Sequence, residues 1–265
     1  MPIASVIVTY RKNLSPERER NLLATLQTWS KVPDHDLIVV EQDHAPSLGS
    51  LHLPKQTQTR FVFNPTAFNK CWGYNLGARM AKTPWLCFTD ADVVLHTPAA
   101  DIMQALRSNL AVVKPHTHTL DLNEEQSQAY LQQPVFDLTH LPKGRQAKGE
   151  HSPLAAPTCY IKRDAFQHLG AWDERFSGWG GEDDAFSYLI ERARMPTIML
   201  PGDAVHLYHP RNTPDSSAEA LKLYQNNLQV LSEIKLSHDE ALKRFAEVNW
   251  QTMGHHLRYV PEPSN

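Results

Sequence analysis

The chain has 265 residues, of which 41% are hydrophobic and 21% charged, the composition of a globular protein that can bury a sizeable core. Its formal net charge of -3 offers no basic surface for a polyanion, so nucleic acid is disfavoured as a partner. No apolar run approaches the roughly 20 residues that span a bilayer, and the three cysteines form no CxxC pair. We therefore expect free thiols in a cytoplasmic protein without a transmembrane segment, for which peripheral docking on a membrane surface stays open.

Strands and helices alternate through the first third of the chain. Short β-branched apolar runs predict buried strands at 5–10, 36–43, 60–64 and 85–92. Leucines at helical spacing predict a helix at 16–29, which begins after Ser15 as a candidate N-cap. A second helix is expected at 69–81 despite two glycines. This rhythm predicts an α/β fold in a single domain, with a mixed, mainly parallel sheet flanked by helices.

A polar segment separates these elements from the rest of the chain. Residues 116–152 are rich in Gln, His, Pro and Lys, so we expect a long loop there. Further predicted elements follow it: a strand and a helix at 156–166, a helix from 182, two short strands within 197–209, and helices at 216–234 and 237–248. Ser237 and Glu240 have the spacing of a capping box at the start of the last helix. Neither an internal repeat nor a domain linker is visible.

Polar residues follow three of the predicted strands, at 9–11, 41–43 and 90–92. Ligands of parallel α/β sheets bind at the carboxyl ends of the strands. We therefore expect these three groups to meet around one crevice.

Two pairs of candidate metal ligands stand out. Asp90 and Asp92 follow a strand with one residue between them, so one can bind a metal while the other reaches a different part of the ligand. Hard divalent cations prefer carboxylate oxygens and bridge to phosphates. His206 and His209, joined to one aspartate, would complete a mixed site that favours Mn²⁺ over Mg²⁺. Taken alone, the aspartates are more typical of a solvated turn, and each histidine of a strand edge.

Six motifs occur in a fixed order: TYR, EQD, FNKxxGxNxG, TDAD, WGGEDD and HxxH. This order resembles that of nucleotide-sugar glycosyltransferases with the GT-A (Rossmann-like) fold. The N-terminal half is similar to bacterial family 2 glycosyltransferases, and residues 156–211 to galactosyl- and N-acetylgalactosaminyltransferases, for which WGGEDD is the most specific match. The resemblance implies a catalytic domain at 1–212, with a nucleotide-binding half at about 1–115 and an acceptor half at about 150–212. A C-terminal helical extension at 213–265 lies outside the resemblance.

The resemblance also implies a metal site. In the family, the second acid of the DxD motif binds manganese, which corresponds to Asp92, and Asp90 would lie near the donor ribose and sugar. The family completes the site with a Met-x-x-His or similar pair, whereas this chain has His206 and His209. Which of the two histidines binds the metal stays open, and Mg²⁺ is the alternative ion.

The WGGEDD motif implies the catalytic end of the site. The family uses the aromatic ring and the glycine backbone to hold sugars, the glutamate to hold the acceptor, and the next acid as the catalytic base. The matching residues are Trp179, Gly180, Gly181, Glu182 and Asp183. Glycines let the backbone approach a sugar closely, and a carboxylate beside it can take the proton of an incoming hydroxyl. The competing interpretation is a glycine turn before an acidic helix N-terminus.

Donor contacts are implied at the strand ends and on the second helix, by Thr9, Tyr10, Arg11, Asp43, Asn69, Lys70 and Asn75. Each of these residues is equally well explained by capping or by surface polarity. Arg145 and Lys148 are further candidates for a clamp on the diphosphate.

These assignments predict a metal-dependent inverting glycosyltransferase that transfers a hexose or N-acetylhexosamine from a UDP-sugar to a saccharide or glycan acceptor, by analogy in polysaccharide biosynthesis. A retaining enzyme of the same fold is one alternative, and a non-catalytic carbohydrate- or nucleotide-sugar-binding protein is another. A nucleotidyltransferase shares the DxD logic but not WGGEDD. Asp183 favours inversion, since retaining relatives carry Asn there. The intact acids Asp92 and Asp183 favour catalysis over binding alone.

Overall fold

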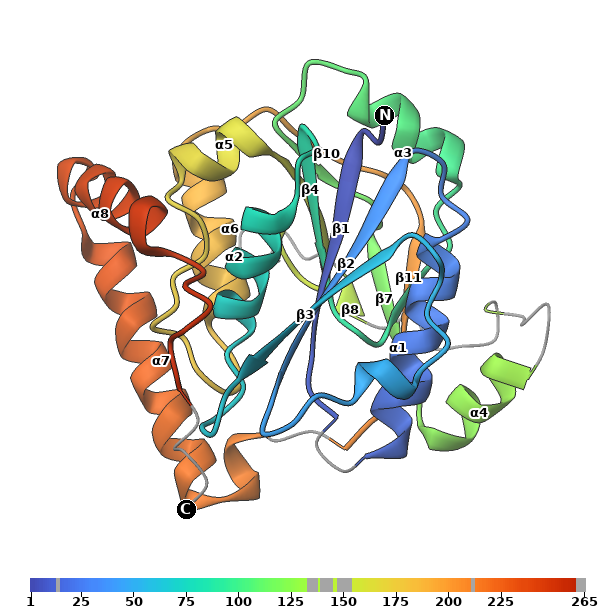
Figure 1. Cartoon of the computed structure of the whole chain (residues 1–265). Coiled ribbons are helices and arrows are strands. Elements are labelled where there is room, and N and C mark those ends of the chain that lie inside the picture. Colours follow the sequence, from blue (N-terminus) through green and yellow to red (C-terminus); the bar gives the residue numbers. More distant parts are fainter. Residues whose placement is uncertain (13–14, 133–137, 139–144, 147–153, 211–212, 261–265) are drawn as a thin grey trace.

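The computed structural model describes residues 1–12, 15–132, 138, 145–146, 154–210 and 213–260. Its larger sheet has seven strands in the order β10-β6-β9-β4-β1-β2-β3 (Figure 1). The strands are β1 Ala4–Tyr10, β2 His35–Asp43, β3 Thr57–Phe63, β4 Trp85–Thr89, β6 Val112–Lys114, β9 Thr158–Lys162 and β10 Thr197–Met199. All neighbours pair in parallel except β9, which runs antiparallel to β4 and β6. The prediction of a mixed, mainly parallel α/β sheet is confirmed.

A second sheet of four strands in the order β5-β11-β7-β8 lies beside the first. Its strands are β5 Val93–Leu95, β11 Asp203–His206, β7 His118–Asp121 and β8 Arg145–Gln146. β11 pairs antiparallel with β5 and parallel with β7, so the segment after the acid motif and the strand that ends at His206 meet in one small sheet.

Side chains alternate across the large sheet and build two apolar cores. On β1, Val6 and Val8 face one side, with α1 (Pro16–Trp29) and α3 (Ala99–Leu106), whereas Ile7 faces the other. That other side is covered by α2 (Lys70–Met80), α5 (Arg163–His168) and α6 (Glu182–Arg192), with α7 (Ala218–Leu236) and α8 (Asp239–Thr252) outside them (Figure 1). The predicted helices at 16–29, 69–81 and from 182 are confirmed.

The two glycines of α2 allow it to lie very close to the sheet. A Cβ added at Gly73 would overlap the side chains of Thr9 and Gln42, and one added at Gly77 would overlap Ile7. Glycine lowers intrinsic helix propensity, and here close packing on β1 offsets that cost. The start of α2 is thereby fixed near the carboxyl end of β1.

The C-terminal helices form as predicted, and the chain after α8 returns to α2. The Arg79 guanidinium donates hydrogen bonds to the carbonyls of Gln251 and Met253, and the Trp72 indole donates to the carbonyl of His255 (2.9 Å). The extension is therefore packed onto the helix that begins at Lys70.

Two local predictions are wrong. Residues 116–132 are not a loop but contain β7 and α4 (Glu124–Gln132). The Ser237 hydroxyl donates to the Glu233 carbonyl of the preceding helix, and α8 has His238 as its N-cap, so the capping box does not form. Ser15 is the N-cap of α1 and Pro16 its first residue, as predicted, but the Ser15 hydroxyl bonds the Glu17 carboxylate (2.5 Å) and makes no cap bond. Short 3₁₀ turns occur at Leu48–Ser50 and Pro214–Ser216.

The described part of the chain contains no helix with the length and apolarity that a bilayer crossing requires. Its three cysteines, Cys71, Cys87 and Cys159, are buried free thiols, as predicted. The compartment stays a prediction.

Candidate active site

A cavity of about 710 Å³ opens at the carboxyl ends of β1 and β4. This volume lies within the range of small-molecule sites. Residues 9–11, 65–68, 90–92 and 178–184 line it, together with His206, His209 and one face of α7. The expected meeting of strand ends therefore occurs for β1 and β4. The 41–43 group is absent from the lining.

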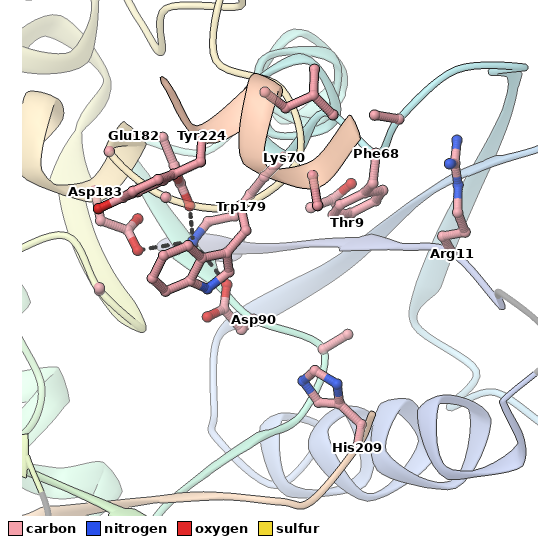
Figure 2. A pocket seen from close by; sticks show the side chains of 18 of the residues that line it. Thr9, Arg11, Phe68, Lys70, Asp90, Trp179, Glu182, Asp183, His209 and Tyr224 are labelled. Atoms are coloured by element: carbon pink, nitrogen blue, oxygen red, sulfur yellow. Dashed lines mark hydrogen bonds and ion pairs between the residues drawn. The ribbon is translucent and has the colours of Figure 1, made fainter. Parts of the chain in front are cut away.

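Lys70 lies at the centre of three carboxylates, and we call these four residues the Lys70 cluster (Figure 2). Its Nζ lies 3.0 Å from Asp183 Oδ2, 3.2 Å from Asp90 Oδ1 and 3.3 Å from Glu182 Oε1. The lysine side chain is 14% exposed. One oxygen of Asp183, Oδ1, is buried without a hydrogen-bond partner, as is Glu182 Oε2. The cluster thus combines one ammonium with three acids and retains free acceptor oxygens.

Two helix starts bring the Lys70 cluster together. Asn69 caps α2, because its Oδ1 accepts a hydrogen bond from the Trp72 amide (2.8 Å), and Lys70 is the first helical residue. Gly181, with φ of 91°, is the N-cap of α6 and sends Glu182 and Asp183 into its first turn. These functions explain the glycine immediately before the acids.

Burial and charge set the protonation of the cluster. Burial alone would lower the pKa of Lys70, but Asp183, Asp90 and Glu182 raise it well above its usual value. Burial raises the pKa of Asp183 to about 7, although Lys70 acts in the opposite direction. A carboxylate with a pKa near neutral is suited to take a proton during a reaction.

Asp92, His206 and His209 form a second group, which we call the Asp92 cluster. One ligand atom from each lies within 4.8 Å of the others. His209 Nε2 is 2.9 Å from Asp92 Oδ2, and His206 Nε2 is 3.4 Å from Asp92 Oδ1. Burial favours the neutral form of Asp92, but His206 and His209 hold its pKa well below the usual range.

The composition of the Asp92 cluster fits a transition-metal ion. One carboxylate and two imidazoles match Mn²⁺ better than Mg²⁺. Asp92 Oδ1 is buried and accepts no hydrogen bond, which leaves a lone pair for a cation. The two aspartates of the DxD motif part as predicted: Asp92 faces the histidines, and Asp90 accepts a hydrogen bond from the Tyr74 hydroxyl (3.1 Å) in the other cluster.

Asp121 supports the Asp92 cluster, and sequence reasoning missed it. Its Oδ1 lies 3.4 Å from Nδ1 of His206, on the ring side opposite to Asp92. The register of β11 and β7 places His206 directly beside Asp121. A carboxylate in this position fixes the tautomer and orientation of a metal-binding imidazole. These residues are brought together by the pairing of β11 with β7, which the sequence does not predict.

The outer wall of the cavity is aromatic and comes partly from α7. Trp179 is 50% exposed, and its ring centroid lies 5.5 Å from that of Tyr224. Asn227, also on α7, donates from its amide nitrogen to the carbonyls of Ser177 (3.0 Å) and Gly180 (2.9 Å). The C-terminal extension therefore holds the WGG turn in place. The helical period of α7 is the only sequence signal for this face.

Of the predicted donor-binding residues, those at the end of β1 line the cavity: Thr9, Tyr10 and Arg11. The guanidinium of Arg11 donates to the carbonyls of Gln42, Asn64 and Thr66 at 2.7, 3.0 and 2.7 Å. It therefore holds the 64–66 segment against the end of β1.

Three other predicted donor contacts lie outside the cavity lining. Asn75 is fully buried, and its amide bonds both the amide nitrogen and the carbonyl of Trp172. Asp43 accepts hydrogen bonds from the backbone amides of Lys12 and His44, and Asn69 is occupied as the cap of α2. A nucleotide contact has no support in this geometry for any of the three. The side chain of Arg145 and all of Lys148 lie outside the described residues.

No protein-family model matches the chain. It is 22% identical over 276 residues to polypeptide N-acetylgalactosaminyltransferase 6 of Mus musculus, which covers 95% of this chain and 44% of the relative. It is 24% identical over 254 residues to validoxylamine A glucosyltransferase of Streptomyces hygroscopicus subsp. limoneus, which covers 84% of this chain and 55% of the relative. A solved structure of GalNAc-T7 with UDP, GalNAc and Mn²⁺ matches with a TM-score of 0.57 at 14% identity, over 94% of this chain and 54% of that one.

The chain has the GT-A fold. The predicted resemblance to glycosyltransferases is confirmed by the two curated relatives, although the chain spans only about half of their length. The end of β4, the small sheet and the starts of α2 and α6 together position both clusters around one cavity.

Proposed function

We propose that this chain is a metal-dependent inverting glycosyltransferase, which transfers a hexose or N-acetylhexosamine from a UDP-sugar to a carbohydrate acceptor. One observation carries the proposal: the Lys70 cluster and the Asp92 cluster line the same cavity, beneath the exposed ring of Trp179. The curated relatives are named as sugar transferases, and the solved structure contains UDP, GalNAc and Mn²⁺, which supports this substrate class.

The Asp92 cluster would hold the metal end of the donor. Asp92, His206 and His209 supply three ligand atoms. Bound Mn²⁺ would supply charge that offsets the diphosphate and its developing negative charge. Asp121 would keep His206 oriented.

Asp183 would act as the general base on the acceptor. The acceptor hydroxyl oxygen forms the new bond to the anomeric carbon, the bond from that carbon to the phosphate oxygen breaks, and UDP leaves with its electron pair. The hydroxyl proton passes to Asp183, whose free Oδ1 is the oxygen available for it. A single displacement of this kind inverts the anomeric configuration. Trp179 offers an apolar face to a sugar ring, and Glu182 an oxygen for an acceptor hydroxyl.

Lys70 would keep these acids in place during the reaction. It forms ion pairs with all three of them, so it offsets part of their mutual repulsion in a largely buried site. Its contact to Asp183 leaves the other oxygen of that carboxylate free.

The test is a panel of UDP-glucose, UDP-galactose, UDP-GlcNAc and UDP-GalNAc, with GDP-mannose as the control nucleotide, assayed for UDP release with Mn²⁺ and with EDTA. We expect Mn²⁺-dependent release from at least one UDP-sugar. With an accepted saccharide, NMR of the product should show the anomeric configuration opposite to that of the donor. Retention would assign the retaining mechanism instead, and tight UDP-sugar binding without any turnover would assign a binding protein.

A further inference from the structure

Three cationic side chains line the cavity within the described residues: Arg11, Lys70 and Arg18. The first two already interact with other groups of the protein. Arg11 bonds three backbone carbonyls, and Lys70 bonds three carboxylates. Neither can turn to a new anion without giving up several of these bonds.

Arg18 differs from both. It is the third residue of α1, and its guanidinium makes one hydrogen bond among the described residues, from Nη2 to the Pro210 carbonyl at 3.3 Å. Its Nε is buried without a hydrogen-bond partner, and no described carboxylate forms an ion pair with it. A guanidinium carries five N–H donors in a planar fork, so most of the hydrogen-bonding capacity of Arg18 is unused.

The position of Arg18 is at the metal end of the cavity. Its hydrogen-bond partner Pro210 directly follows His209 in the chain. Arg18 also lines the same cavity as Asp92 and His209. Arg18 is therefore tied to the chain segment that carries His209.

The charges of the two clusters favour a further cation near the proposed metal site. The Lys70 cluster has one positive and three negative groups, a formal sum of -2 when all are ionised, and so repels a diphosphate. A UDP-sugar carries two negative charges on its diphosphate and gains another when the sugar bond breaks. A divalent ion bound by Asp92 brings a net charge of only about +1. A nearby guanidinium can bond phosphate oxygens through two parallel N–H groups.

We infer that Arg18 binds the diphosphate of the donor, beside the metal held by Asp92, His206 and His209. This inference rests on the proposed function, since it assumes a nucleoside diphosphate in the cavity. Arg18 would then contribute both to donor affinity and to stabilisation of the leaving group. Neither the motif order nor the family resemblance points to this residue.

The experiment compares Arg18→Gln with Arg20→Gln. Arg20 lies two residues further along the same helix, about 200° around its axis, and does not line the cavity. Both changes remove one positive charge, so the comparison distinguishes a direct contact with the ligand from the long-range effect of the charge. Binding of UDP, UMP and uridine is measured by calorimetry with saturating Mn²⁺, and circular dichroism checks folding.

We expect Arg18→Gln to weaken UDP binding by about 10- to 100-fold, the range for a hydrogen bond between charged groups, and to change uridine binding less than about twofold. UMP should show an intermediate loss, Arg18→Lys a partial one, and Arg20→Gln should bind UDP like the unaltered protein. Unchanged UDP affinity in Arg18→Gln, or an equal loss in Arg20→Gln, would overturn the inference. If the unaltered protein binds no UDP with Mn²⁺, the proposed function itself fails.

Discussion

The Lys70 cluster and the Asp92 cluster lie in one cavity but handle buried charge in opposite ways. In the Lys70 cluster, the protein supplies its own cation, and one lysine contacts three acids. In the Asp92 cluster, one buried carboxylate faces two imidazoles that can be neutral, and one of its oxygens has no donor. The first cluster is held together by its own ion pairs, whereas the proposed metal ion would complete the second.

This difference predicts which substitutions affect metal binding and which affect proton transfer. Substitutions in the Asp92 cluster should respond to the Mn²⁺ concentration. Substitutions in the Lys70 cluster should respond to pH and leave metal binding intact. A result that crosses this division would show that the two clusters act as one unit.

The largest effect is expected at Asp92. Asp92→Ala removes the only carboxylate of its cluster, so we expect loss of Mn²⁺ binding and of turnover at any Mn²⁺ concentration. Activity and Mn²⁺ binding by electron paramagnetic resonance check this, with the exposed Asp101→Ala on α3 as a control for charge. In chelator-treated protein, Mn²⁺ should restore activity better than Ca²⁺. Full activity in the presence of a chelator would contradict a metal role.

The next effect is expected at Asp183. Asp183→Asn removes the base but keeps the shape, so kcat should fall by about 10²–10⁴-fold, while UDP and Mn²⁺ binding change less than about twofold. Steady-state kinetics and UDP titration measure the two quantities, and Glu191→Gln on the exposed side of α6 is the matched control. A variant that turns over normally would mean that another carboxylate is the base.

Substitution of either histidine should weaken Mn²⁺ binding less than substitution of Asp92. Each of His206→Ala and His209→Ala leaves two ligand atoms, so we expect weakened Mn²⁺ binding with activity that returns at high Mn²⁺. Titration of activity with Mn²⁺ gives the apparent affinity of each variant. A histidine whose removal leaves that affinity unchanged is not a ligand, which decides the question that the HxxH motif alone leaves open.

A smaller effect is expected at Asp121, which contacts no substrate. Asp121→Asn should lower Mn²⁺ affinity by about tenfold, at the low end of the range for partners of metal-binding residues, because Asp121 lies partly in solvent. The kcat at saturating Mn²⁺ should stay close to that of the unaltered protein. A lowered kcat with normal Mn²⁺ affinity would contradict the orienting role.

Sequence reasoning found the architecture because the pattern of apolar runs is local. The strands around Val6 and Ile38 and the helices after Pro16 and Gly181 follow from short stretches of chain. The prediction of a loop at 116–132 is wrong because β7 is only four residues long and the segment has the polar composition of a loop. Ser237 misled because its hydroxyl bonds the end of α7 instead of the start of α8.

For the site, the sequence indicates the acidic and histidine residues, which stand out after apolar strands or a glycine turn. The acids at 90–92 and 182–183 and the histidine pair line the cavity. It could not reveal that one lysine serves three acids, that strand register sets Asp121 beside His206, or that Asn227 holds the WGG turn. Most of those relations depend on contacts between segments far apart in the chain, such as Lys70 and Asp183. For the same reason, the sequence does not reveal that Asn75 joins α2 to Trp172.

The smallest effect is expected in stability, and it tests the charge imbalance of the Lys70 cluster directly. Burial raises the pKa of Asp183 to about 7 in the folded protein, whereas the unfolded chain titrates near the ordinary value. Between these two values only the folded state holds the proton, so the contribution of Asp183 to stability is present at low pH and is lost as pH rises through about 7.

Asparagine stays neutral at every pH, so Asp183→Asn should match the unaltered protein near pH 4 and become the more stable of the two by pH 8. We expect a gain of roughly 2–4 °C in Tm at pH 8, which about 1 kcal/mol produces in a protein of this size. Thermal unfolding in EDTA measures the difference without metal, and the histidines cancel because both proteins share them. Asp101→Asn should show no such trend with pH. A Tm difference that is constant from pH 4 to pH 8 would mean that Lys70 neutralises the three acids fully, and the contrast between the two clusters would then lie in the metal site alone.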